Sequence, residues 1–179
     1  VVTPCEEGIE TVGEYIVHPA FSRNAQVGGG WTTSSGENIE GIWVGKFETT
    51  GSSSNVTVKP GESSLRSRTI NNQYKAGKSA TFGETSSEVI GSHMAKNSEW
   101  GAVAYLTHSD YGLDGAEIEQ NTERYITGGS STKSEIYTTN AGQSTTGNAY
   151  GVYDMSGGAS ENVANYSGGS FSKEGNTEE

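Results

Sequence analysis

The stretch NAYGVYDMSGGASENVANY, residues 148–166, carries the most information in this 179-residue chain. Its first half places aromatic residues and glycine around the pair Asp154 and Met155, and residues 158–162 are all small or polar. Glycine supplies backbone conformations that other residues avoid, and Asn and Ser side chains bond to their own backbone. We therefore expect this stretch to form ordered loop structure.

The whole chain shares this polar character. Only 31% of the residues are hydrophobic, and 26 are glycine. A composition so poor in apolar residues approaches that of disordered chains, but three Trp and nine Tyr argue for a folded core. We predict one loop-rich domain with a small core over residues 1–171, followed by a flexible tail at residues 172–179.

Charge and cysteine content narrow the classes of partner. The net charge of −11 speaks against nucleic acid, because phosphate binding needs clustered Lys and Arg. No apolar run is long enough to span a bilayer, so no direct membrane span is expected. The only cysteine is Cys5, so an intrachain disulfide is excluded. The start at Val1 without Met is compatible with a processed or trimmed piece of a longer protein.

Local patterns predict few strands. Alternating β-formers predict strands at residues 14–21 and 39–50, and NVTV at residues 55–58 predicts a third, short strand. In the second strand we expect Ile42, Val44 and Phe47 to face inward.

Helical signals are weak over residues 63–76 and clear over residues 96–109. In the second segment Trp100, Val103, Ala104 and Thr107 recur at helical spacing, and Asn97 or Ser98 can cap its start.

The familiar catalytic patterns are weak here. His18, His93 and His108 lack the spacing of a zinc site. HSD at residues 108–110 has the residue types of a hydrolase triad, but adjacent residues seldom converge in triad geometry. The glycines at residues 28–30 lack the Lys and the helix of a phosphate-binding loop. None of the 22 acidic residues stands out as a glycosidase pair.

Residues 145–163, TTGNAYGVYDMSGGASENV, resemble the core signature of the formylglycine-generating enzyme (sulfatase-modifying factor) family, N-x-[YF]-G-[LIV]-[YW]-D-M-x-G-N-V-W-E-W. Residues 98–109 and 41–50 resemble two further family blocks, in family order. The matching positions that we interpret as the scaffold signature are Asn148, Tyr150, Gly151, Tyr153, Asp154, Met155 and Gly157.

The segments HPAF, VKPG, SLRS and STTGN are similar to a branch found in surface proteins of gut Firmicutes, some of them behind a prepilin-type leader. The resemblance covers most of residues 14–167. It implies a loop-rich α+β fold of the C-type-lectin-like kind, with a small twisted antiparallel sheet and one or two helices. It also implies an extracellular location on a bacterial cell surface.

Departures from the family pattern argue against its enzymatic activity. The enzymes hold copper with two late cysteines, and this chain has none after Cys5. Both Trp positions of the family's G-N-V-W-E-W segment are small or polar here, and the closing block is reduced to SGGSF at residues 167–171. The resemblance further implies a calcium site at Glu161, although Gly158 replaces the Asn ligand. The alternative is that Glu161 only accepts local backbone N–H groups.

We therefore expect a non-catalytic extracellular domain of a pilin-like or adhesin protein, which presents a site for a surface ligand or forms filaments. The candidate ligand loops are residues 28–38 and residues 127–147. Trp31 in the first loop either contacts the ligand or packs onto the core. The alternative is an enzyme with altered metal or hydrolytic chemistry, which needs His93, His108 and a carboxylate to converge. A third hypothesis is self-association, in which a copy docks on the edge left by the missing closing strand.

Overall fold

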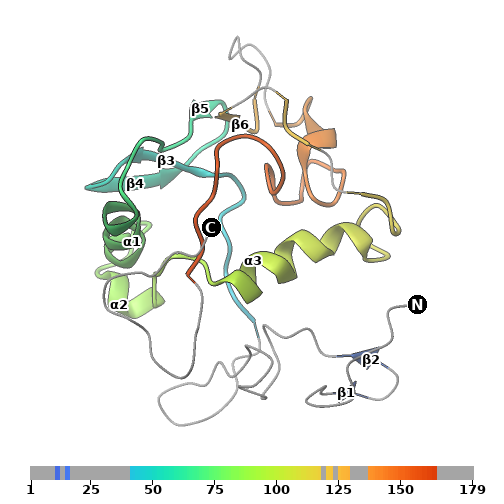
Figure 1. Cartoon of the computed structure of the whole chain (residues 1–179), viewed down its shortest axis with the longest axis horizontal. Helices are drawn as coiled ribbons and strands as arrows, with labels where there is room; N and C mark the ends of the chain where they lie inside the picture. The colour runs from blue at the N-terminus through green and yellow to red at the C-terminus, as the bar shows by residue number, and fades with distance from the viewer. Residues whose placement is uncertain are drawn as a thin grey trace.

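The computed structural model describes residues 11–12, 15–16, 41–117, 120–122, 125–129 and 137–164 (Figure 1). Several predictions fall outside these residues: the loop at residues 28–38 with Trp31, His18, most of the strand at residues 14–21, and the tail at residues 172–179. The described part combines short strands with helices, so the predicted α+β class is confirmed at that level.

The strands form three antiparallel pairs within the described residues, where we expected one small sheet. β1 (Thr11–Val12) pairs with β2 (Tyr15–Ile16), β3 (Thr49–Ser52) with β4 (Asn55–Val58), and β5 (Glu62–Ser63) with β6 (Ile126–Thr127). The short strand predicted at NVTV is confirmed as β4.

The strand predicted at residues 39–50 is wrong over most of its described part, because β3 begins only at Thr49. Phe47 is buried as expected, but Val44 is 45% exposed. The backbone carbonyl of Lys46 accepts a hydrogen bond from the N–H of Tyr153 at 2.8 Å. This segment is therefore tied to the signature stretch instead of continuing a regular strand.

Three helices lie in the described residues: α1 (Ile70–Ser79), α2 (Ser87–Ile90) and α3 (Asn97–Ala104). α1 begins later than predicted, because Thr69 Oγ1 accepts a hydrogen bond from the N–H of Asn72 and caps the helix there. None of these helices is long and apolar enough to cross a membrane.

The helix predicted at residues 96–109 is confirmed as α3 continued by a 3-10 turn, η3 (Tyr105–His108). Its predicted cap is wrong, since Lys96 is the N-cap residue. Glu99 in the first turn accepts a hydrogen bond from the N–H of Lys96 at 2.6 Å, which satisfies one of the free donors at the helix start.

The core is small and partly aromatic. The ring of Tyr153, which is 1% exposed, lies with its centroid 5.2 Å from that of Phe47, and Tyr137 packs edge-on against both. Tyr153 also donates its hydroxyl hydrogen to the carbonyl of Tyr137. Figure 1 shows the red end of the signature stretch crossing the centre of the view between α1 and α3, and hydrogen bonds join it to Gln73 of α1 and Trp100 of α3.

Candidate ligand-binding pocket

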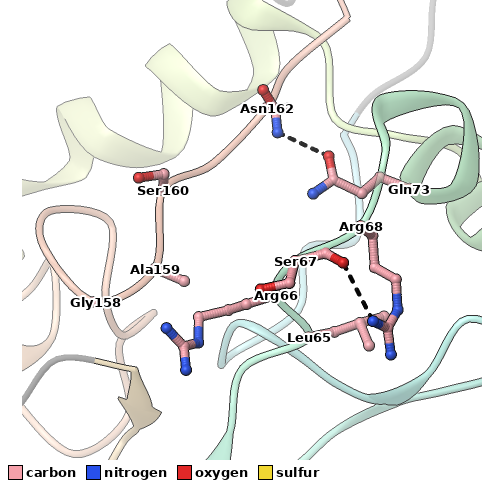
Figure 2. Close-up of a pocket in the computed structure, with 9 residues that line it drawn as sticks. All are labelled: Leu65, Arg66, Ser67, Arg68, Gln73, Gly158, Ala159, Ser160 and Asn162. Carbon is pink, nitrogen blue, oxygen red and sulfur yellow. Dashed lines mark hydrogen bonds between the residues drawn. The ribbon is translucent and has the colours of Figure 1, made fainter.

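A polar pocket of about 390 Å³ lies between the chain that leads into α1 and the end of the signature stretch. Figure 2 shows both of its walls. The first wall consists of Leu65, Arg66, Ser67, Arg68 and Gln73, and the second of Gly158, Ala159, Ser160 and Asn162. The volume lies within the range of small-ligand pockets.

The first wall is anchored by backbone bonds and then turns sharply. Leu65 donates its N–H to the carbonyl of Thr49 at 2.7 Å, and Ser64 donates to the carbonyl of Tyr125 at 2.9 Å. Ser67 has a positive φ of 56°, a conformation that costs a non-glycine residue free energy and often marks functional sites. The turn separates Arg66 from Arg68 just before α1 begins.

The second wall depends on two consecutive glycines with positive φ, Gly157 at 80° and Gly158 at 66°. Asn121 donates its N–H to the carbonyl of Ser156 and accepts at its own carbonyl from the N–H of Gly158. A Cβ at Gly157 would overlap the backbone of Asn121, and a Cβ at Gly158 would lie 2.8 Å from the Glu48 carboxylate. Both positions therefore require glycine.

Glu48 lies behind the pocket and joins its two walls. Its carboxylate accepts hydrogen bonds from Ser64 Oγ and, at 2.8 Å, from the backbone N–H of Ala159. Burial is the largest effect on this group and raises the pKa of Glu48 from 4.5 to about 7, although these two hydrogen bonds oppose the shift. The nearby carboxylates of Asp154 and Glu161 raise the pKa further.

The contacts of Ser64 accommodate either charge state of Glu48. Ser64 has one hydroxyl hydrogen, but its Oγ lies within bonding distance of both the Glu48 carboxylate and the carbonyl of Tyr125, the latter at 3.0 Å. A protonated Glu48 donates to Ser64 Oγ, which leaves the serine hydrogen for Tyr125. Every group then has a partner, so the site also accommodates the protonated form that burial of Glu48 favours.

Asp154 anchors the signature stretch from within. Its side chain is 1% exposed and accepts three hydrogen bonds, from Asn121 Nδ2, Thr127 Oγ1 and the N–H of Gly128. Burial raises the pKa of Asp154, and the three donors act against that shift. Its positive φ of 62° is strained for a non-glycine residue, and the three bonds hold it there.

The other signature residues have separate roles. Asn148 Oδ1 accepts a hydrogen bond from the N–H of Tyr150, and Met155 is buried. A Cβ at Gly151 would overlap the side chain of Thr146. Tyr150 differs from the others, because its side chain is 93% exposed and adds little to the core.

Glu161 accepts a hydrogen bond from the indole Nε1 of Trp100, which is a side-chain donor and not one of the local backbone donors expected as the alternative to calcium. Glu161 remains exposed in part, but protein atoms displace water around its carboxylate, and this desolvation raises the pKa of Glu161. The hydrogen bond from the Trp100 indole lowers the pKa, and the nearby Asp154 raises it.

Only one of the two side-chain ligands that the resemblance implies for calcium is present at this position. Gly158 supplies no side-chain oxygen where the family has Asn. No group of three His, Cys, Asp or Glu side chains suited to a metal ion occurs in the described part of the chain. Calcium binding by Glu161 stays a prediction.

Histidines and acids do not gather as the enzyme hypothesis requires in the part of the chain that is described. His93 Nε2 lies 3.1 Å from Glu99 Oε1, and its Nδ1 lies 2.6 Å from the carbonyl of Gly91. His108 instead stacks against Tyr105, with ring centroids 5.2 Å apart. The two histidines belong to different local contacts.

The chain was compared with models of protein families, with curated proteins and with solved structures. None of the three comparisons found a match. The resemblance to the formylglycine-generating enzyme family therefore stays a prediction.

Sequence reasoning assigned no role to the arginines of the pocket. The segment SLRS contributes only to the family resemblance, and Arg68 lies just beyond it. The signal present in the sequence is a pair of arginines, Arg66 and Arg68, separated by a single serine in a serine-rich segment of an acidic chain. Their place beside the signature loop depends on contacts between distant segments, which local patterns do not contain.

Proposed function

We propose that this chain is a non-catalytic, extracellular ligand-binding domain of a bacterial surface protein, with a C-type-lectin-like fold, and that the pocket beside α1 is its binding site. The pocket itself carries this proposal. Its walls are irregular segments fixed by buried hydrogen bonds, an arrangement that places binding residues in loops on a stable frame.

The chemistry of the lining supports binding over catalysis. The side chains are arginines, amides, serine hydroxyls and a leucine, which recognise and orient polar ligands. The absence of the family's cysteine pair also supports binding over catalysis, because the copper chemistry of the enzymes in that family depends on those thiolates.

The cell-surface location is supported by the sequence resemblance alone. The fold family is supported by that resemblance and by the buried places of Tyr153, Asp154 and Met155 in the signature. Filament formation is supported by the sequence resemblance alone. Size-exclusion chromatography and electron microscopy of native material separate these cases, since monomers alone would count against a filament subunit.

The binding role is tested by filling the pocket. Ser160 lines the pocket and is exposed, so Ser160→Trp adds an indole to the second wall with little effect on the frame. Thr85→Trp adds the same ring at an exposed position outside the lining. An array of bacterial and host glycans and peptides, probed with each protein, should show ligands that the Thr85 variant keeps and the Ser160 variant loses. Identical arrays for both variants would contradict the proposal.

A further inference from the structure

The charge of the pocket narrows the class of ligand. In the described residues the ion pair joins His93 with Glu99, so neither arginine of the pocket has a carboxylate partner there. Because an unpaired guanidinium presents up to five N–H donors and no acceptor, each arginine is available to an anionic oxygen group.

Each guanidinium group already makes a contact before a ligand arrives. The Cζ atom of Arg66 lies 3.1 Å from the centroid of the Tyr125 ring, a stacked arrangement that arginine adopts well. Arg68 Nη1 donates to the carbonyl of Ser67 at 3.3 Å. Figure 2 shows the two groups on either side of Leu65. Such ordering reduces the entropy lost when a ligand binds.

Neutral polar groups complete the pocket. Asn162 Nδ2 donates to Gln73 Oε1 at 2.8 Å, which ties the end of the signature stretch to α1. This bond leaves Asn162 Oδ1 as an acceptor and the Gln73 amide nitrogen as a donor. The pair suits hydroxyl groups, which both donate and accept hydrogen bonds.

The acidic surface of the chain does not prevent anion binding here. At physiological ionic strength the Debye length is about 8 Å, so a bound ligand is influenced mainly by nearby charges. Two acids near the lining already have hydrogen-bond partners: Glu161 accepts from Trp100, and Glu48 accepts from Ser64 and Ala159.

We propose that the pocket binds an acidic sugar, with the anionic group held by Arg66 and Arg68 and the ring hydroxyls held by Gln73 and Asn162. This inference rests on the proposed binding function and specifies its ligand. The anionic group is a carboxylate, as in a uronic acid, or a sulfate ester, since arginine binds both through paired N–H donors.

The test is a titration of the folded chain followed by ¹⁵N NMR, which also reports the arginine side-chain N–H groups. The probes are a glucuronic-acid disaccharide, its neutral glucose counterpart, a sulfated glucose disaccharide and inorganic sulfate. The variants are Arg66→Gln and Arg68→Gln. Lys78→Gln is the control, because it removes one positive charge from the last turn of α1 outside the lining.

We expect at least one acidic disaccharide to shift pocket resonances and the neutral one to bind at least about 10-fold more weakly, as loss of a charged hydrogen bond predicts. Each arginine variant should weaken binding by about 10-fold, and Lys78→Gln should not. The carboxylate and sulfate probes decide between the two anionic groups.

Other results would overturn the inference in distinguishable ways. Equal binding of acidic and neutral disaccharides, lost in Ser160→Trp, would refute the anionic ligand and leave the binding function standing. If inorganic sulfate binds as tightly as the acidic disaccharides, the claim that the pocket recognises the sugar ring is refuted. Binding that survives both the arginine variants and Ser160→Trp would refute the pocket itself, and no response to any probe would refute an acidic-sugar ligand.

Discussion

Glu48 Oε1 accepts a hydrogen bond from the backbone N–H of Ala159 at 2.8 Å, across a sequence separation of 111 residues. The same carboxyl group contacts Ser64, so one side chain connects both walls of the pocket. The shape of the pocket therefore depends on a buried acid that lies behind it.

Glu48→Gln should change how stability depends on pH. Because the folded-state pKa of about 7 exceeds the usual 4.5, the folded protein holds the proton more tightly than the unfolded chain. Its contribution is fully present below pH 4.5 and is lost as pH rises to about 7, a change of about 3 kcal/mol. Glutamine can donate to Ser64 and accept from Ala159 at any pH. Urea unfolding from pH 5 to 8 should show a shallower decline than in the parent.

The control for this experiment is Glu84→Gln, at an exposed position. It removes the same charge without touching the pocket frame and should keep the slope of the parent protein. Equal slopes for Glu48→Gln and the parent would show that Glu48 is not the titrating group.

Thr127 and Thr107 form a matched pair, since both are 0% exposed. Thr127 Oγ1 donates to Asp154 at 2.7 Å and accepts from the N–H of Glu48 at 3.0 Å. Thr107 Oγ1 has no hydrogen-bond partner among the described residues. Thr127→Val should cost about 1–3 kcal/mol, because it removes a donor from a buried carboxylate. Thr107→Val should stabilise by about 1 kcal/mol. Thermal unfolding measures both, and equal losses would contradict this difference.

The sequence predicts those parts of the fold that local patterns determine. The helical spacing of Trp100, Val103 and Thr107 correctly gave α3, and NVTV correctly gave β4. Local patterns did not predict the path of residues 41–48, because the N–H of the distant Tyr153 donates a hydrogen bond to the carbonyl of Lys46 and fixes that path.

The pocket was missed for the same physical reason. Its arginines belong to one segment and its glycine loop to another, and only tertiary contacts bring the two together. The burial of Asp154 agrees with its place in the signature, but no local pattern indicates that its partners are Asn121 and Thr127.

Gly157→Ala should be far more harmful than Gly61→Ala. The two glycines have similar φ values, 80° and 70°, so both substitutions carry the cost of a left-handed conformation, about 1 kcal/mol. A Cβ at Gly61 meets nothing within 4 Å, whereas one at Gly157 overlaps the backbone of Asn121. We expect an additional loss of at least about 2 kcal/mol at Gly157 in denaturant unfolding. Equal losses would mean that this backbone contact is not as close as described.

His93 should stabilise the fold more at acidic than at alkaline pH. Both ring nitrogens face acceptors, the carbonyl of Gly91 and the carboxylate of Glu99, which only a doubly protonated ring satisfies. The hydrogen bond to Glu99 is the main cause that raises the pKa of His93, while burial opposes it. The contribution is therefore complete below about pH 6.5 and is lost as pH rises through the folded-state pKa.

His93→Ala should remove this pH-dependent contribution. Its size is at most about 0.5 kcal/mol, because the ring is 39% exposed and solvent screens the pair. Melting temperatures at pH 6 and pH 9 should differ less in the variant than in the parent. His108→Ala, which removes a ring stacked on Tyr105, is the control and should keep the parent difference.

The bond between Trp100 and Glu161 gives a direct test of the calcium prediction. Calcium on the Glu161 carboxylate would draw negative charge away from the indole N–H, whichever oxygen it takes. The ¹⁵N indole resonance of Trp100 should then move toward its position in Glu161→Gln as calcium rises to about 5 mM, above the dissociation constants of weak extracellular sites. Magnesium at the same concentration is the control, because it demands a stricter octahedral set of ligands. A resonance that does not respond to calcium, but does move in Glu161→Gln, would show that this carboxylate serves the indole and not a metal ion.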